Sequence, residues 1–143
     1  MKFNLIDAVL EQTHDRIVAI KQVSLAEEYL ADHFPTFPVL PGVLMMETMV
    51  QAARRLLADR GDPRLVLGAV QGLKFGSFVR PGETLAVDVT VTGSEDGTYQ
   101  CRGKGRVIRH DGERSDETAV SGRFTMRPIR RTLSDERTRL QET

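Results

Sequence analysis

Alternation of apolar and polar residues predicts that most of this chain is β-structure. The clearest stretch is 83–93, in which every second residue is apolar: Leu85, Val87, Val89 and Val91. Successive side chains of a strand point to opposite faces, so this pattern predicts one buried face and one solvent-exposed face. We expect further strands at 3–10, 16–24, 65–78, 98–109 and 116–127.

Turn-forming residues separate the last of these predicted strands. Glu95-Asp96-Gly97 and Asp111-Gly112 are hairpin signals, because aspartate and glycine tolerate the positive φ angles that tight hairpins need. The strands on either side of each turn should therefore be antiparallel neighbours. Gly103 and Gly105 lie inside one of these strands, and we read them as a bulge or bend.

One long helix is predicted to begin after Pro41-Gly42 and to end near Asp59, before Gly61-Asp62-Pro63. At about 100° per residue, its polar residues share one sector: Glu47, Thr48, Gln51, Arg54 and Arg55. That pattern is typical of a half-exposed amphipathic helix with a solvated Glu47. Val43 and Leu44 lie in or beside the same sector, however, which favours burial near the helix start.

These elements together predict an α+β fold in which a single long helix packs on an antiparallel sheet. The 143 residues suit one domain, which we place at 1–127. Residues 26–31 can form a short helical turn, and 128–143 lack an apolar face and are expected to be a polar tail.

Composition narrows the classes of function. The chain has 20 Lys and Arg against 20 Asp and Glu and no basic run joined to aromatics, which gives nucleic-acid binding little support. No apolar run approaches the roughly 20 residues of a membrane span. Cys101 is the single cysteine, so no intrachain disulfide is possible, and with no leader-like start we expect a reduced, cytoplasmic setting.

His33 and Glu47 are the candidate catalytic residues. The loop before the helix has prolines at 35, 38 and 41, which stiffen it and suit it to aiming His33. A histidine exchanges protons near neutrality, and a carboxylic acid in apolar surroundings can donate one. His14 and His110 lie in polar turns and are read as solvated, and no cluster has the spacing of metal ligands.

The same segment resembles a family signature. His33-Phe34-Pro35, Pro38, Pro41-Gly42-Val43-Leu44, Glu47 and Gln51-Ala52 follow the order and spacing HFPxxPxxPGVLxxExxxQA of the FabZ-type 3-hydroxyacyl-acyl-carrier-protein dehydratases. The likeness spans residues ~4 to 126 and includes LKFGSFVRPGETLAVDVTV. Thr36 stands where the family usually has glycine, and the family's segment before the first strand, often with a Pro-His-Arg stretch, has no counterpart.

The resemblance implies a hotdog fold, a curled antiparallel sheet wrapped around one long central helix. It implies dehydration of a (3R)-3-hydroxyacyl thioester to the trans-2-enoyl thioester in fatty acid biosynthesis, with His33 of one subunit and Glu47 of the other in each site. Gly42, Val43 and Gln51 are the implied substrate-binding residues, the Gly42 amide holding the thioester carbonyl and Gln51 a water near the acid. No cofactor or metal is implied. The expected partners are acyl carrier protein, with coenzyme A as the alternative thiol carrier, and a second copy of the chain in a homodimer or a trimer of dimers.

Two other functions stay open from the sequence. A hotdog thioesterase shares the fold and the acyl thioester substrate but releases a free thiol. A noncatalytic member would bind acyl chains or partner an active subunit, which Thr36 makes worth testing.

Overall fold

The computed structural model describes residues 4–27, 30, 38–60, 64–110 and 115–129. Its sheet has six strands in the order β1-β2-β4-β5-β6-β3, and every neighbouring pair is antiparallel. The strands are β1 (Ala8–Gln12), β2 (Arg16–Gln22), β3 (Leu65–Phe75), β4 (Thr84–Glu95), β5 (Thr98–Ile108) and β6 (Glu117–Pro128). The helix is α2 (Gly42–Leu56).

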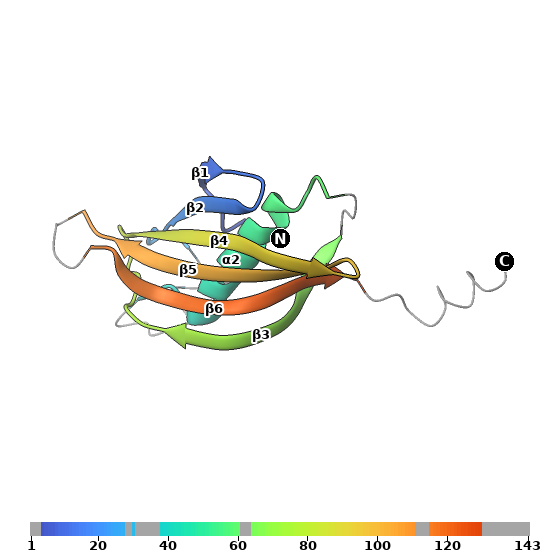
Figure 1. Cartoon of the computed structure of the whole chain (residues 1–143). Helices are drawn as coiled ribbons and strands as arrows, with labels where there is room; N and C mark the ends of the chain where they lie inside the picture. The colour runs from blue at the N-terminus through green and yellow to red at the C-terminus, as the bar shows by residue number, and fades with distance from the viewer. Residues whose placement is uncertain (1–3, 28–29, 31–37, 61–63, 111–114, 130–143) are drawn as a thin grey trace, which may run out of the picture.

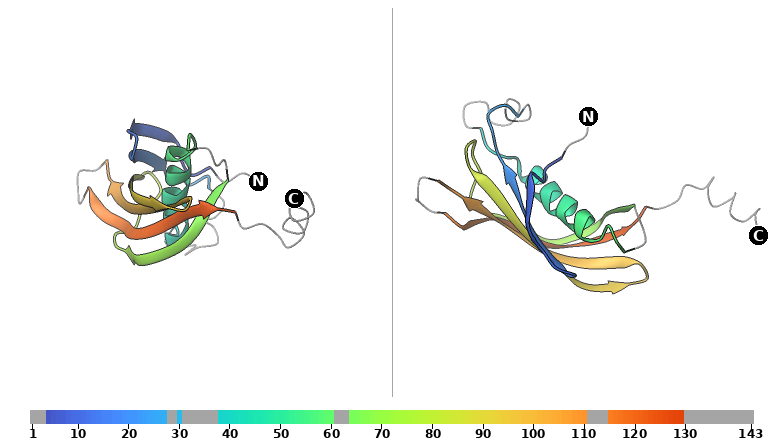
Figure 2. Two further views of the ribbon diagram at one scale, coloured as in Figure 1. Left: turned by 45° about the vertical axis from the view of Figure 1, so that its right-hand side comes forward. Right: turned by 90° about the horizontal axis from the view of Figure 1, so that it is seen from above.

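The sheet curls around α2, which lies on its concave side (Figures 1 and 2). The core forms between the buried residues of the helix, such as Met49 and Ala53, and the inward residues of the strands, such as Ile17 and Val89. Ile17 and Val89 lie opposite each other in the β2–β4 register. This is the architecture of the predicted α+β hotdog fold, which is thereby confirmed.

Gly103 determines how closely α2 approaches the sheet. A Cβ added to Gly103 would lie 2.6 Å from Sδ of Met49, closer than Cβ atoms come to atoms of non-neighbouring residues. Glycine therefore leaves room for Met49, which is fully buried, to pack against β5 in its present position. The predicted irregularity occurs at Gly105, where the β5–β6 register shifts before Arg106.

The β4–β5 hairpin forms where the sequence predicts it. Asp96 and Gly97 have φ angles of 51° and 81°, the positive values of a tight two-residue hairpin turn. The predicted turn at Asp111-Gly112 lies outside the described residues, although the strands that flank it, β5 and β6, are antiparallel neighbours as expected.

Several predicted boundaries and burials are wrong. β1 begins at Ala8 rather than residue 3, and β3 ends at Phe75 rather than residue 78. After β3, Gly76 and Ser77 donate backbone hydrogen bonds to Ala119 and Thr118, so this short segment still follows β6 before the chain turns. The helix ends at Leu56, about one turn earlier than expected. The predicted turn at 26–31 is described only in part, and there the Leu30 N–H donates to the Glu27 carbonyl at 3.2 Å, as in a helical turn. The tail at 128–143 falls outside the described residues from 130 onward.

On the helix, Thr48 is completely buried although it was predicted in the polar sector. Its hydroxyl donates to the Leu44 carbonyl at 2.7 Å, and a hydroxyl satisfied within its own helix can be buried without the cost of an unpaired donor. Val43, for which burial was predicted, is 73% exposed in the single chain. Nothing in the described part of the same chain covers it.

Candidate active site

Three predicted site residues form one stripe along α2. Val43, Glu47 and Gln51 follow one another at intervals of four, which places them on neighbouring turns of one helix face. Glu47 and Gln51 are half-buried, and Val43, nearest the helix start, is exposed. The sequence prediction that these residues share a face is therefore confirmed.

The Gln51 amide links Glu47 to the N-terminal segment. Its Nε2 donates to Oε1 of Glu47 at 3.3 Å, and its Oε1 accepts from the backbone N–H of Leu5 at 2.8 Å. A backbone N–H can only donate, so the amide oxygen must face Leu5 and the NH2 group must face Glu47. Gln51 thus presents a donor to the carboxyl group, and its orientation is fixed by the chain ahead of β1.

Sequence reasoning missed Leu5. The residue is 2% exposed, and its side chain is part of the core. Its contribution to the site is a backbone donor, which every residue except proline carries and which therefore leaves no mark in a sequence.

The start of α2 is suited to binding a carbonyl oxygen or an anion. Pro41 precedes the helix, no side chain caps this end, and the first turn has no acidic residue among the described positions. The amides of Leu44 and Met45 both donate to the Pro41 carbonyl. The N–H groups at the start of a helix lack intrahelical acceptors, and the helix dipole adds positive potential there.

Gly42 is the first residue of α2 and packs beneath an aromatic ring. A Cβ on Gly42 would lie 2.9 Å from Cε1 of Phe75, the last residue of β3. Glycine therefore allows the ring to lie against the helix start. The Phe75 side chain is itself 51% exposed, so the ring forms a wall open to solvent on one side.

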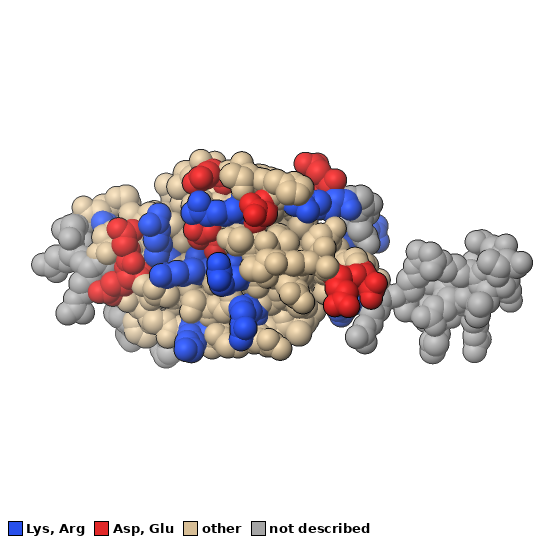
Figure 3. All heavy atoms as spheres, viewed as in Figure 1, with Lys and Arg blue, Asp and Glu red and all other residues tan. Residues whose placement is uncertain are grey.

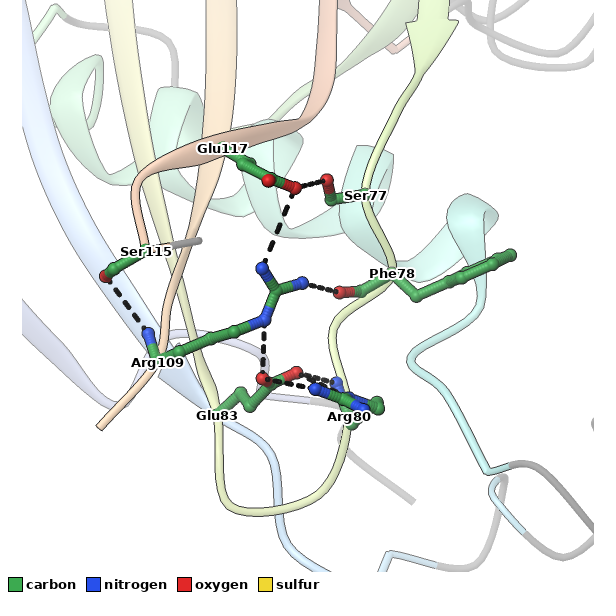
Figure 4. Close-up of polar contacts among 7 residues, drawn as sticks. All are labelled: Ser77, Phe78, Arg80, Glu83, Arg109, Ser115 and Glu117. Carbon is green, nitrogen blue, oxygen red and sulfur yellow. Dashed lines mark hydrogen bonds and ion pairs between the residues drawn. The ribbon is translucent and has the colours of Figure 1, made fainter. Parts of the chain in front are cut away.

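A buried polar network holds the segment between β3 and β4 beside this helix start (Figure 4). Arg109 bonds Glu83 through Nε at 2.7 Å and the Phe78 carbonyl through Nη2 at 3.2 Å. The side chains of Arg109 and Glu83 are each 10% exposed. One residue beyond Phe78, the Val79 carbonyl accepts from Leu40 N–H at 2.8 Å, which ties the network to the approach to α2.

Glu83 is ionised in this network. Burial alone would raise its pKa, but the hydrogen bonds from the Arg80 side chain and backbone, together with that from Arg109, outweigh burial and hold the pKa below the ordinary value of 4.5. Sequence patterns contain no sign of this pairing, because Glu83 lies just before β4 and Arg109 just after β5, and the two meet only in the folded sheet.

His33 and Thr36 lie outside the described residues, so the approach of His33 to Glu47 stays a prediction. In the described part of the chain, no three His, Cys, Asp or Glu side chains are grouped closely enough to hold a metal ion. Cys101 is buried, and burial raises its pKa to about 12, so the thiol stays protonated. None of the described helices is long and apolar enough to cross a bilayer.

Comparison with known proteins gives the family. The ApeI-like family, described as ApeI dehydratase, matches residues 9–112. The chain belongs to this dehydratase family. The match to this dehydratase family includes Gly42, Val43, Glu47 and Gln51, whereas Leu5 precedes the matched region.

Curated relatives of this family member are named 3-hydroxyacyl-[acyl-carrier-protein] dehydratase FabZ. The one from Thermotoga neapolitana is 40% identical over 106 residues, covering 73% of this chain and 77% of the relative. The one from Aromatoleum aromaticum is 36% identical over 126 residues, covering 83% and 85%. These relatives confirm the resemblance found in the sequence and the assignment to a hydro-lyase family.

Among solved structures, this family member is similar to the dehydratase heterocomplex ApeI:P of Xenorhabdus doucetiae. The TM-score is 0.63 at 21% identity, and the match covers 88% of this chain and 98% of the other. That likeness supports the fold.

Proposed function

We propose that the chain dehydrates a (3R)-3-hydroxyacyl thioester, carried on acyl carrier protein, to the trans-2-enoyl thioester in fatty acid biosynthesis. The names of the relatives support the reaction and the carrier. The observation that carries the proposal is the Glu47–Gln51 pair on α2, one and a half turns after an uncapped helix start at Gly42. The acid and the backbone N–H groups that would bind the thioester carbonyl then lie on the same helix.

Elimination of water needs a base, an acid and a stabilised enolate. His33 takes the proton from C2, the electron pair forms the C2–C3 double bond, and the C3–O bond breaks. Protonated Glu47, or a water that it orients, gives the proton that turns the departing hydroxyl into water. Gln51 fixes the carboxyl group by its 3.3 Å hydrogen bond.

The developing negative charge lies on the thioester oxygen, and we assign its stabilisation to the Gly42 N–H. Loss of one such donor costs about 3–4 kcal/mol in other enzymes. Val43, next along the exposed stripe, is proposed to contact the acyl chain. No cofactor takes part in the proposed reaction.

We also propose that the active unit is a homodimer, with a trimer of dimers as its larger form. Apolar side chains are exposed around the helix start in the single chain: Val43 is 73%, Phe75 51% and Phe78 53% exposed. A second copy would remove this surface from water, at about 25 cal/mol for each Å² buried. It would also bring His33 of one subunit to Glu47 of the other. A cytoplasmic setting suits the free, buried Cys101.

The first experiment follows enoyl absorbance and thiol release together, with 3-hydroxyacyl and trans-2-enoyl thioesters of acyl carrier protein and of coenzyme A. Dehydration or hydration without thiol release supports the proposal. Thiol release without the enoyl chromophore would assign a thioesterase instead. In the same assay, His33→Ala and Glu47→Gln should each lower the rate by roughly 10²–10⁴, and undiminished turnover in either variant would refute that residue's role.

Subunit exchange tests whether the site is shared. Mixing the inactive His33→Ala and Glu47→Gln homodimers should restore one intact site in each mixed dimer. Random exchange makes half the dimers mixed, so recovery should approach roughly a quarter of wild-type activity. An inactive mixture, despite exchange shown by mass spectrometry, would place both residues of a site in one chain.

A noncatalytic partner subunit is the second candidate, because the similar structure from Xenorhabdus doucetiae is a dehydratase heterocomplex. Activity of the purified chain alone contradicts this candidate. Activity that appears only with a second, different subunit supports it.

A further inference from the structure

The outer face of the sheet, opposite α2, is strongly basic at its centre. Arg102 and Lys104 point outward from β5, where they alternate with the buried Cys101 and Gly103. Basic side chains gather on this face in Figure 3, which views the sheet from the side away from the helix. This surface is distinct from the proposed active site on α2.

The basic residues line a groove of about 680 Å³, which we call the basic groove: Lys74, Arg102, Lys104 and Arg123 with the hydroxyl residues Thr90 and Ser121. It extends from β2 across β4, β5 and β6 to β3. With neighbouring strands about 4.8 Å apart, the groove is roughly 19 Å wide across the sheet. Its volume lies within the range of small-molecule sites.

Charge in the basic groove is unbalanced. Asp88 is the acidic residue in its lining, and Arg16 binds both oxygens of that carboxylate at 2.9 and 2.7 Å. Arg102 lies directly opposite Arg123 in the β5–β6 register. Like charges at directly opposed sheet positions are destabilising. Within the part of the chain that the structure describes, neither arginine has a carboxylate within 4.0 Å.

We propose that the basic groove binds a ligand carrying two or more phosphate groups. Two guanidinium forks, two ammonium groups and two hydroxyls offer donors that match phosphate oxygens, and arginine binds such groups bidentately. A bound anion would also relieve the repulsion between Arg102 and Arg123. The lining described here has no aromatic ring to stack a nucleobase and no apolar wall for an acyl chain, so phosphate groups are the feature recognised.

The test is calorimetric titration of the full chain with inorganic tripolyphosphate in 0.15 M salt. We expect saturable binding, with Arg102→Gln and Arg123→Gln each weakening it roughly tenfold or more. Arg106→Gln is the matched control, because Arg106 is also an exposed arginine on β5 but lies outside the basic groove and pairs with Asp116 at 3.6 Å. The affinity of Arg106→Gln for tripolyphosphate should stay within about threefold of wild type.

Thermal unfolding provides a second readout. Tripolyphosphate should raise the Tm of the wild type and of Arg106→Gln, but not that of Arg102→Gln or Arg123→Gln. The proposal is overturned if the wild type does not bind, or if Arg106→Gln loses as much affinity as the groove variants, which would mean attraction by net charge alone. Tighter binding of poly-glutamate than of tripolyphosphate to the same groove would overturn it in favour of an acidic protein surface.

Discussion

Two substitutions at Gln51 separate its acceptor from its donor. Gln51→Leu removes both, so the Leu5 N–H loses its acceptor and Glu47 loses its donor. An unsatisfied buried donor costs about 1–3 kcal/mol, and this bond is partly buried, so we expect about 1–2 kcal/mol. For a domain of 143 residues, that corresponds to a fall in Tm of roughly 3–7 °C.

Gln51→Glu keeps an acceptor for Leu5 but replaces the donor with a second carboxylate. At the 3.3 Å separation of the native pair, two full charges repel by about 1 kcal/mol in water and about 5 kcal/mol at an effective dielectric of 20. Both side chains are half-buried and can rotate apart, so we expect the lower end of this range. This repulsion exists only when both groups are ionised, and not with the protonated Glu47 that the proposed reaction uses, so the penalty should shrink as the pH falls.

The assay is thermal unfolding between pH 3 and pH 8, with dehydration rates measured at neutral pH. Gln51→Leu should lower the rate roughly two- to tenfold, the worth of one hydrogen bond to the acid. Gln12→Leu, an exposed glutamine at the end of β1, is the control and should leave both readouts unchanged. A wild-type Tm for Gln51→Leu, or a penalty for Gln51→Glu that persists at pH 3, would refute the bridging role.

Three further predictions concern the rest of the fold. Gly103→Ala should destabilise by about 1–3 kcal/mol, because its Cβ would overlap Met49. The same substitution should cost less in a Met49→Ala background, and an equal cost in both backgrounds would show that the overlap is not the cause. Glu83→Gln should cost about 3 kcal/mol at pH 7. The lowered pKa of Glu83 means that its stabilisation is complete above about pH 4.5 and is lost as pH falls through the folded value. The unfolding free energies of wild type and variant, measured in urea, should therefore converge towards pH 3. A difference in unfolding free energy that does not change with pH contradicts this. Cys101 should resist iodoacetamide at pH 8 in the folded chain and react in urea, because burial raises its pKa to about 12; rapid labelling of the native protein would show that it is accessible.

Local periodicity predicts much of the fold because it reports which face of an element is buried. In β4, Leu85, Val87 and Val89 are all fully buried, as their alternation predicts. The spacing of Glu47 and Gln51 likewise places them on one helix face without any tertiary information.

The errors have physical causes that periodicity does not contain. Thr48 is polar but buried, because its hydroxyl is satisfied by the Leu44 carbonyl. Val43 is apolar but 73% exposed in the single chain, because hydrophobicity gives a tendency to be buried and does not say where in the folded chain the residue lies. The Glu83–Arg109 ion pair joins positions 26 residues apart, which no local pattern connects.

The hydrogen bond from Leu5 to Gln51 has a practical consequence for anyone who prepares this protein. An affinity tag fused to Met1, or cleavage that removes the first few residues, would act a short distance from the donor that orients the Gln51 amide. A change in turnover could then be mistaken for a property of the enzyme. A tag after Thr143, far along the chain from this bond, is the better choice for kinetic work, and comparison of the two tagged forms would measure how much the N-terminal segment contributes.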